Sequence, residues 1–166
     1  MRAIVQILLR DRSGRILARR DASNAVMRSG AELVARAFAG QGAGITHMGV
    51  GNSDAADPDD FSLDALSNEG VAGENLVGAT EVAIAADAFQ FVPDAARRVM
   101  VVRLRATLPD SAALGTVREA GLLARGEAGA TLYNRVTFAP FTKGDDHELT
   151  LFWEVAFPYG DLQALF

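Results

Sequence analysis

The chain has 166 residues, of which 49% are hydrophobic, and this is enough to build the core of one domain spanning residues 1–166. A net charge of −5 gives no electrostatic reason to expect a nucleic-acid partner. The sequence contains no cysteine, which excludes a disulfide framework and a thiolate metal site.

Residues 2–20 predict a β-hairpin at the N-terminus. Two β-prone runs, MRAIVQILLR and RILARRD, flank the turn DRSG, in which Gly14 can adopt a positive φ. The apolar run before Arg10 is too short for a secretory signal, and no run approaches a membrane span, so we expect a soluble protein made in the cytoplasm. Arginines around the turn invite a nucleic-acid interpretation, but charges also keep an edge hairpin soluble, and we favour this second interpretation. These arginines are Arg10, Arg12, Arg15, Arg19 and Arg20.

One substantial helix is predicted near residues 25–39. Met27, Ala31, Val34 and Phe38 recur at helical spacing, with Leu33 beside them. Ser23 or Asn24 can cap its start and Gly40 can end it. Because Gly30 costs about 1 kcal/mol against Ala inside a helix, we expect another element to pack closely there.

The stretch ITHMGVG predicts a strand that leads into a long, acidic surface loop at residues 52–75. Loops of this length in compact domains are usually functional or mobile. The loop carboxylates suggest Ca²⁺ as a ligand, but their spacing does not match an EF-hand, and a solvated loop is the favoured interpretation. These carboxylates belong to Asp54, Asp57, Asp59, Asp60 and Asp64.

Five further runs have strand composition and are separated by turn signals. They are EVAIAADAFQFV, RRVMVVRLRATL, TVREAGLLA, TLYNRVTFAPF and HELTLFWEVAF. The last run alternates strictly and predicts one apolar face made of Leu149, Leu151, Trp153, Val155 and Phe157. Strands that follow one another at short intervals favour a mainly β (α+β) fold, an antiparallel β-sandwich.

No residue pattern identifies a catalytic, cofactor-binding or metal site. His47 and His147 are the only histidines, and the sequence nominates no third metal ligand. The glycines of MGVGNSDA lack the ending of a phosphate loop, and glutamate pairs are too common here to indicate a glycosidase. Trp153 lies on an apolar strand face, where a core position is more common than a sugar-binding platform. We therefore expect a protein that is not an enzyme and needs no cofactor.

Four segments, in their order, resemble structural proteins of phage tails and of phage-like contractile injection systems. They are NAVMRSGAELVARAFAG, ITHMGVGNSDAA with the loop that ends in ALSNEG, VREAGLLARGEAGATLYNRVTFAPFTK, and ELTLFWEVAF. The resemblance covers most of residues 24–157 and is to tail-collar or tail-fibre attachment domains and their baseplate relatives. The hairpin at 2–20 departs from the simplest attachment domains, and no shaft region follows the last strand, so a compact adaptor is expected rather than a whole fibre.

The resemblance implies a non-enzymatic subunit that assembles in the cytoplasm with other particle subunits, as a homo-oligomer in a symmetric virion or injection particle. The alternative is a stand-alone carbohydrate- or ligand-binding β-sandwich module. The acidic loop and the apolar tail at 159–166 are the expected assembly surfaces, comprising Asp57, Asp59, Asp60, Asn68, Glu69, Tyr159, Leu162, Leu165 and Phe166. The expected structural residues are Glu119, Gly121, Arg135 and Trp153. Glu119 and Arg135 are either a cross-strand pair or two independent surface charges, and both interpretations stay open.

Overall fold

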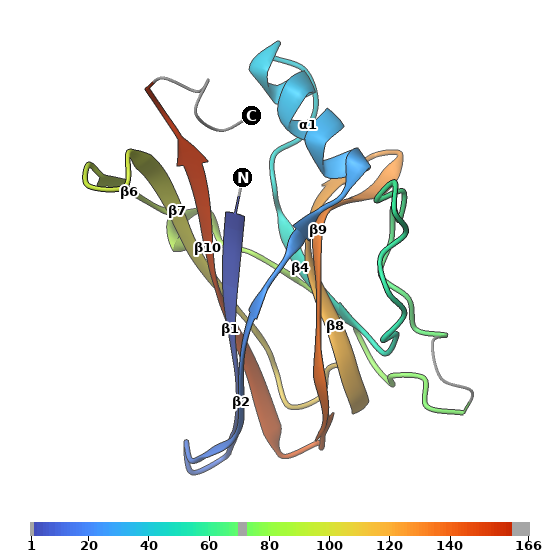
Figure 1. Cartoon of the computed structure of the whole chain (residues 1–166). Helices are drawn as coiled ribbons and strands as arrows, with labels where there is room; N and C mark the ends of the chain where they lie inside the picture. Colours follow the sequence, from blue (N-terminus) through green and yellow to red (C-terminus); the bar gives the residue numbers. More distant parts are fainter. Residues whose placement is uncertain (1, 70–72, 161–166) are drawn as a thin grey trace.

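Two antiparallel five-stranded sheets pack face to face in the computed structural model, which describes residues 2–69 and 73–160 (Figure 1). The first sheet, in spatial order, contains β2 (Ile16–Ser23), β1 (Arg2–Asp11), β10 (His147–Pro158), β7 (Val99–Leu108) and β6 (Gln90–Asp94). The second contains β3 (Ala25–Val26), β9 (Gly129–Lys143), β8 (Gly115–Gly126), β4 (His47–Gly51) and β5 (Glu81–Ala83). The expected mainly β sandwich is confirmed.

The core lies between the two sheets, and both contribute to it. The predicted inward face of the last strand is confirmed, because Leu149, Leu151, Trp153 and Val155 are buried and half-buried Phe157 packs against them. Across the core, β4, β8 and β9 supply buried Met48, Val50, Val117, Ala120, Leu122, Tyr133 and Val136.

The N-terminal hairpin is confirmed. β1 and β2 pair antiparallel, and Gly14 in the turn has a φ of +84°. Asp11 holds this turn closed, because one carboxylate oxygen accepts the backbone N–H groups of Ser13 and Arg15 at 2.9 and 3.0 Å. β2 continues past the predicted end, to Ser23.

The helix α1 (Arg28–Phe38) starts later than predicted. Ala25 and Val26 pair with β9 as the short strand β3, and Met27 occupies the N-cap position, so neither Ser23 nor Asn24 caps the helix. Gly40 follows the helix with a φ of +72°, as a glycine after a helix end commonly does.

The predicted apolar face of the helix is partly wrong. Met27 is buried and Val34 is half-buried, but Ala31 and Phe38 are exposed. The contacts of α1 with β9 include two in its first half, where Gly30 lies against the backbone of Tyr133 and the Ser29 hydroxyl donates to the carbonyl oxygen of Leu132, whereas residues 35–38 are exposed. The last turn therefore extends beyond the sheet that it would need in order to bury Phe38.

Gly30 lies close to the backbone of β9, and its expected tight packing is confirmed. A Cβ at this position would overlap the carbonyl group of Tyr133. We expect Gly30→Ala to lower the free energy of unfolding by about 1–3 kcal/mol, because overpacking outweighs the gain of about 1 kcal/mol in helix propensity. Urea denaturation measures this change. Gly44→Ala is the matched control, since nothing lies within 4 Å of a Cβ there, and an equal loss in the control would contradict the steric explanation.

The run EVAIAADAFQFV does not form the single strand that was predicted. It divides into β5, the 3₁₀ turn η1 (Ala86–Ala88) and β6, because the chain crosses here from the second sheet to the first. Ile84 is buried in the core at the start of this crossover. Among the described residues, no helix has the length and apolar character needed to cross a membrane.

Candidate functional site

The long loop forms a third layer on the outer face of the second sheet. Figure 1 shows it running beside β8 and β9. Leu63 and Leu66 of the loop pack against a small second cluster of buried residues, Met27, Leu123 and Leu132. The loop was expected to be acidic and solvated, and the side chains of Asp54, Asp59, Asp60 and Asp64 are exposed accordingly. Its apolar side chains also make it a cover for the sheet, which was not expected.

Glycines in the sheet give the loop room to approach. A Cβ on Gly51 would overlap the Glu119 carboxylate and the carbonyl oxygen of Ser67. A Cβ on Gly121 would lie 2.5 Å from the carbonyl oxygen of Asn134 and 3.3 Å from the Leu66 side chain. The structural role expected for Gly121 therefore has a steric basis, since a side chain would push the loop away.

Glu119 and Arg135 form an ion pair beneath this layer. The Arg135 Nε donates to the Glu119 Oε2 at 2.5 Å, and the two side chains are 2% and 1% exposed. Glu119 is opposite Thr137 and Arg135 is opposite Gly121, so the pair is diagonal across the strands. Of the two interpretations left open by the sequence, the cross-strand pair is correct, and it is buried rather than superficial.

The same two side chains hold the loop. The Arg135 Nη1 donates to the Asp57 Oδ1 at 2.6 Å and to the carbonyl oxygen of Ala55 at 2.9 Å. On the other side, the Glu119 Oε1 accepts the backbone N–H of Ser67 at 2.7 Å. The ion pair therefore fixes the loop at two points, at Ala55 and Asp57 and again at Ser67, about ten to twelve residues further along the chain.

Burial and pairing act in opposite directions on these charges. Burial raises the pKa of Glu119 above its ordinary value, and the hydrogen bonds from Arg135 and Ser67 offset part of that rise. For Arg135, burial lowers the pKa, but the bonds to Glu119 and Asp57 outweigh it and leave the pKa raised. Arg135 therefore stays charged, and its charge favours the ionised form of the buried Glu119 carboxylate.

Further polar contacts anchor the ends of the loop. Asn68 donates from Nδ2 to the carbonyl oxygen of Leu76 at 3.0 Å and accepts the N–H of Leu76 at 2.6 Å. The backbone N–H of buried Asn52 donates to the carbonyl oxygen of Ser67 at 2.9 Å. Arg118 lies 3.4 Å from the Asp54 carboxylate and 3.1 Å from that of Glu74.

The proposed assembly residues of the loop divide into two groups. Asp57 and Asn68 are turned inward by the contacts above and are half-buried. Asp59, Asp60 and Glu69 are exposed, although Asp60 lies 3.6 Å from Arg28.

The tail residues were also proposed as an assembly surface. Tyr159 is described and is 44% exposed. Its backbone N–H donates to the carbonyl oxygen of Arg98, which places it beside the turn between β6 and β7. Leu162, Leu165 and Phe166 lie outside the described residues.

The helix α1, the turn between β6 and β7 and the end of β10 lie toward one end of the sandwich (Figure 1), and exposed apolar residues belong to or follow these elements. Phe38 is 95% exposed, Phe91 is 69% exposed, and Met100 and Tyr159 are less so. We call these four residues the apolar end. The sequence analysis did not predict that Phe38 and Phe91 are exposed. The period of a helix or strand shows which face is apolar, but it does not show how far the element that packs against this face extends.

The two histidines and the tryptophan are side chains of the types that bind metals and sugars. Within residues 2–69 and 73–160, no cluster of three or more His, Asp or Glu side chains is arranged to hold a metal ion. The His47 Nδ1 lies 2.9 Å from the Thr46 hydroxyl, and the His147 Nδ1 accepts the N–H of Gly144 at 2.9 Å. Trp153 is 1% exposed, so it is a core residue as predicted. Comparisons of the chain with protein-family models, curated proteins and solved structures give no significant match.

Proposed function

We propose that this chain is a non-enzymatic structural subunit of a phage tail or a phage-like contractile injection particle, as a baseplate, collar or fibre-attachment adaptor. It acts by holding neighbouring subunits in register. Its partners are other particle subunits and further copies of itself in a symmetric particle. Assembly takes place in the cytoplasm.

The apolar end is the observation that carries this proposal. Exposed single apolar side chains are common on soluble proteins, but a group of them on separate elements is typical of a contact surface. Phe38, Phe91 and Tyr159 come from α1, β6 and the segment after β10. They would be covered if a neighbouring subunit packed against this end of the sandwich.

The covered sheet supports the same proposal, since contact surfaces are usually carried by a rigid scaffold. The buried ion pair and the Asn68 contacts fix a loop that would otherwise be free to move. The exposed carboxylates of Asp59 and Glu69 are thereby held on an ordered surface.

Removal of the tail tests the proposal. We expect deletion of residues 159–166 to leave the domain folded and to abolish its incorporation into particles when it is co-expressed with the other subunits. The thermal unfolding midpoint of the truncated protein and its co-sedimentation with particles are the two measurements. If the truncated protein unfolds, the tail belongs to its own core and the assignment of the tail is wrong.

Phe38→Ser tests the apolar end without shortening the chain. The side chain is 95% exposed, so stability should be unchanged while incorporation falls. Ile16→Ser is the matched control, because Ile16 is also exposed but follows the β1–β2 turn, at the opposite end of the sandwich (Figure 1). Equal incorporation of the two variants would argue against the apolar end as a contact surface.

A further inference from the structure

Half of strand β7 has an open edge. β6 pairs with β7 only from Val99 to Arg103. Beyond that point, residues 104–108 pair with β10 on one side and with no strand of the described chain on the other. An unpaired strand edge presents a row of backbone donors and acceptors to any extended segment that approaches it.

The strand registers show which backbone groups point outward. The carbonyl oxygen of Ala3 accepts the N–H of Asn24 on the β2 side, so even-numbered residues of β1 bond to β10. The registers of β1 with β10 and of β10 with β7 carry this alternation across the sheet. Even-numbered residues of β7 therefore bond to β10, and the N–H and C=O groups of Arg105 and Thr107 point to the open edge.

The open edges of β9 and β6 are protected. Arg20 donates to the carbonyl oxygens of Ala139 and Pro140 at 2.8 and 3.2 Å, which covers the edge of β9 beyond β3. Pro140 and Pro93 also remove an N–H from β9 and β6. Residues 104–108 (LRATL) contain no proline, and no side chain is seen to cover their edge in the described chain. An exposed strand edge of this kind favours aggregation.

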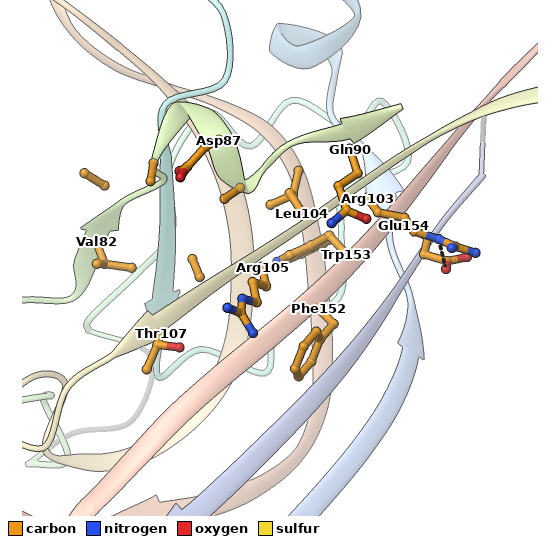
Figure 2. A pocket seen from close by; sticks show the side chains of 14 residues that line it. Val82, Asp87, Gln90, Arg103, Leu104, Arg105, Thr107, Phe152, Trp153 and Glu154 are labelled. Atoms are coloured by element: carbon orange, nitrogen blue, oxygen red, sulfur yellow. Dashed lines mark hydrogen bonds and ion pairs between the residues drawn. The ribbon is translucent and has the colours of Figure 1, made fainter. Parts of the chain in front are cut away.

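A groove of about 750 Å³ lies beside this edge (Figure 2). One part of its wall is aliphatic and is formed by Val82, Ala83, Ala85, Ala88, Leu104 and Ala106. The rest is formed by the aromatic residues Phe152 and Trp153 and by the polar residues Asp87, Gln90, Arg103, Arg105, Thr107 and Glu154. Small side chains leave room for a main chain to come close. The volume is in the range of sites that hold a ligand or a short peptide segment.

Two hydrogen-bond donors in the groove lack an acceptor. Trp153 lines it, and its indole Nε1 is buried without a partner among the described residues. Arg105 is exposed and forms no ion pair within the described chain, whereas its neighbour Arg103 is paired with Glu154 at 2.8 Å. Figure 2 shows Asp87 on the far side of the groove from Arg105. The open groups near β7 therefore favour a carbonyl oxygen and a carboxylate.

We propose that an extended segment of a neighbouring protein subunit binds in this groove as an additional strand beside β7. Its backbone pairs with Arg105 and Thr107, one carbonyl oxygen accepts the Trp153 N–H, and an acidic side chain lies next to Arg105. Backbone groups repeated along a strand are matched by an extended peptide and not by a compact small molecule. The inference rests on the proposed assembly role only for the source of the strand.

A displayed library of random decapeptides, selected against the full chain, tests this inference. Trp153 is the only tryptophan, so its fluorescence reports directly on occupation of the groove. We expect selected peptides to carry an acidic residue in an alternating, β-prone stretch and to shift the Trp153 emission on binding. A selection that yields no peptide able to shift this emission overturns the proposal.

Changes in the protein and in the peptide identify the binding mode. Arg105→Ala should weaken binding about tenfold, as expected for loss of one charge-assisted hydrogen bond, while Arg19→Ala on the distant strand β2 should not. N-methylation of alternate peptide amides should abolish binding for one parity and leave the other parity unaffected. Equal effects for both parities would exclude strand pairing. The particle-incorporation measurement with the tail deletion is independent of these results, so failure of one proposal does not imply failure of the other.

Discussion

Replacing Arg135 by methionine should lower the free energy of unfolding by about 3–5 kcal/mol. The substitution leaves Glu119 buried without its ionic partner, so that its carboxylate keeps only neutral backbone donors, among them the Ser67 N–H. It also releases Asp57 and the carbonyl oxygen of Ala55, so the loop loses one of its two attachments to the ion pair. Guanidinium denaturation followed by circular dichroism measures the change.

The double variant Glu119→Leu with Arg135→Met distinguishes the loss of the ion pair from the cost of leaving an unpaired charge buried. Removing both charges should recover much of the stability, because an apolar pair of similar volume needs no desolvation. A double variant as unstable as the single one would mean that the contacts with Asp57 and Ala55 dominate. Arg103→Met is a matched control at an exposed pair, where the expected loss is below about 1 kcal/mol.

The deficit of the Arg135→Met variant should depend on pH. Loss of Arg135 removes an interaction that lowers the pKa of Glu119, so the folded-state pKa rises further above the ordinary value of 4.5. A folded state that binds its proton more tightly than the unfolded chain is favoured at low pH. The deficit should therefore be smallest below pH 4.5 and should grow as the pH rises toward neutrality. A deficit that does not vary with pH would show that Glu119 is not the destabilised group.

The elements that were predicted correctly are those whose sequence pattern depends on one neighbouring layer or on the local backbone alone. The period of two in β10 needs one apolar face and one polar face, and Leu149, Leu151 and Trp153 are buried accordingly. Gly14 was placed correctly because a tight turn requires a local backbone conformation. Phe38 was placed incorrectly because its burial depends on how far the sheet extends beneath the helix.

The loop layer was not predicted, although β8 carried a sign of it. Residues 119–124 (EAGLLA) are buried without alternation, which is typical of a strand covered on both faces. Register shifts next to Glu119 and at Leu122 also break the period of two. What covers the outer face depends on contacts across long sequence separations, such as Arg135 with Asp57, and sequence spacing does not determine these.

Trp153→Ala should also lower the free energy of unfolding by about 3–5 kcal/mol. Trp153 is the largest of the fully buried side chains, and it lies opposite Val5 on one side and Leu104 on the other. Truncation leaves a cavity between two sheets that are each held by their own hydrogen bonds, so the walls cannot collapse fully into it.

Two further substitutions serve as controls for the Trp153→Ala prediction. Phe152→Ala removes an aromatic side chain from the half-buried outer face of the same strand and should cost clearly less. Trp153→Phe keeps most of the volume and loses only an indole N–H that has no partner in the described chain, so it should retain most of the stability. Circular dichroism during urea denaturation compares all three, because fluorescence is lost with the only tryptophan. If Trp153→Ala were neutral, the indole would have to be exposed in solution. An exposed indole could stack on a sugar ring, so this result would favour the alternative function of a carbohydrate-binding module.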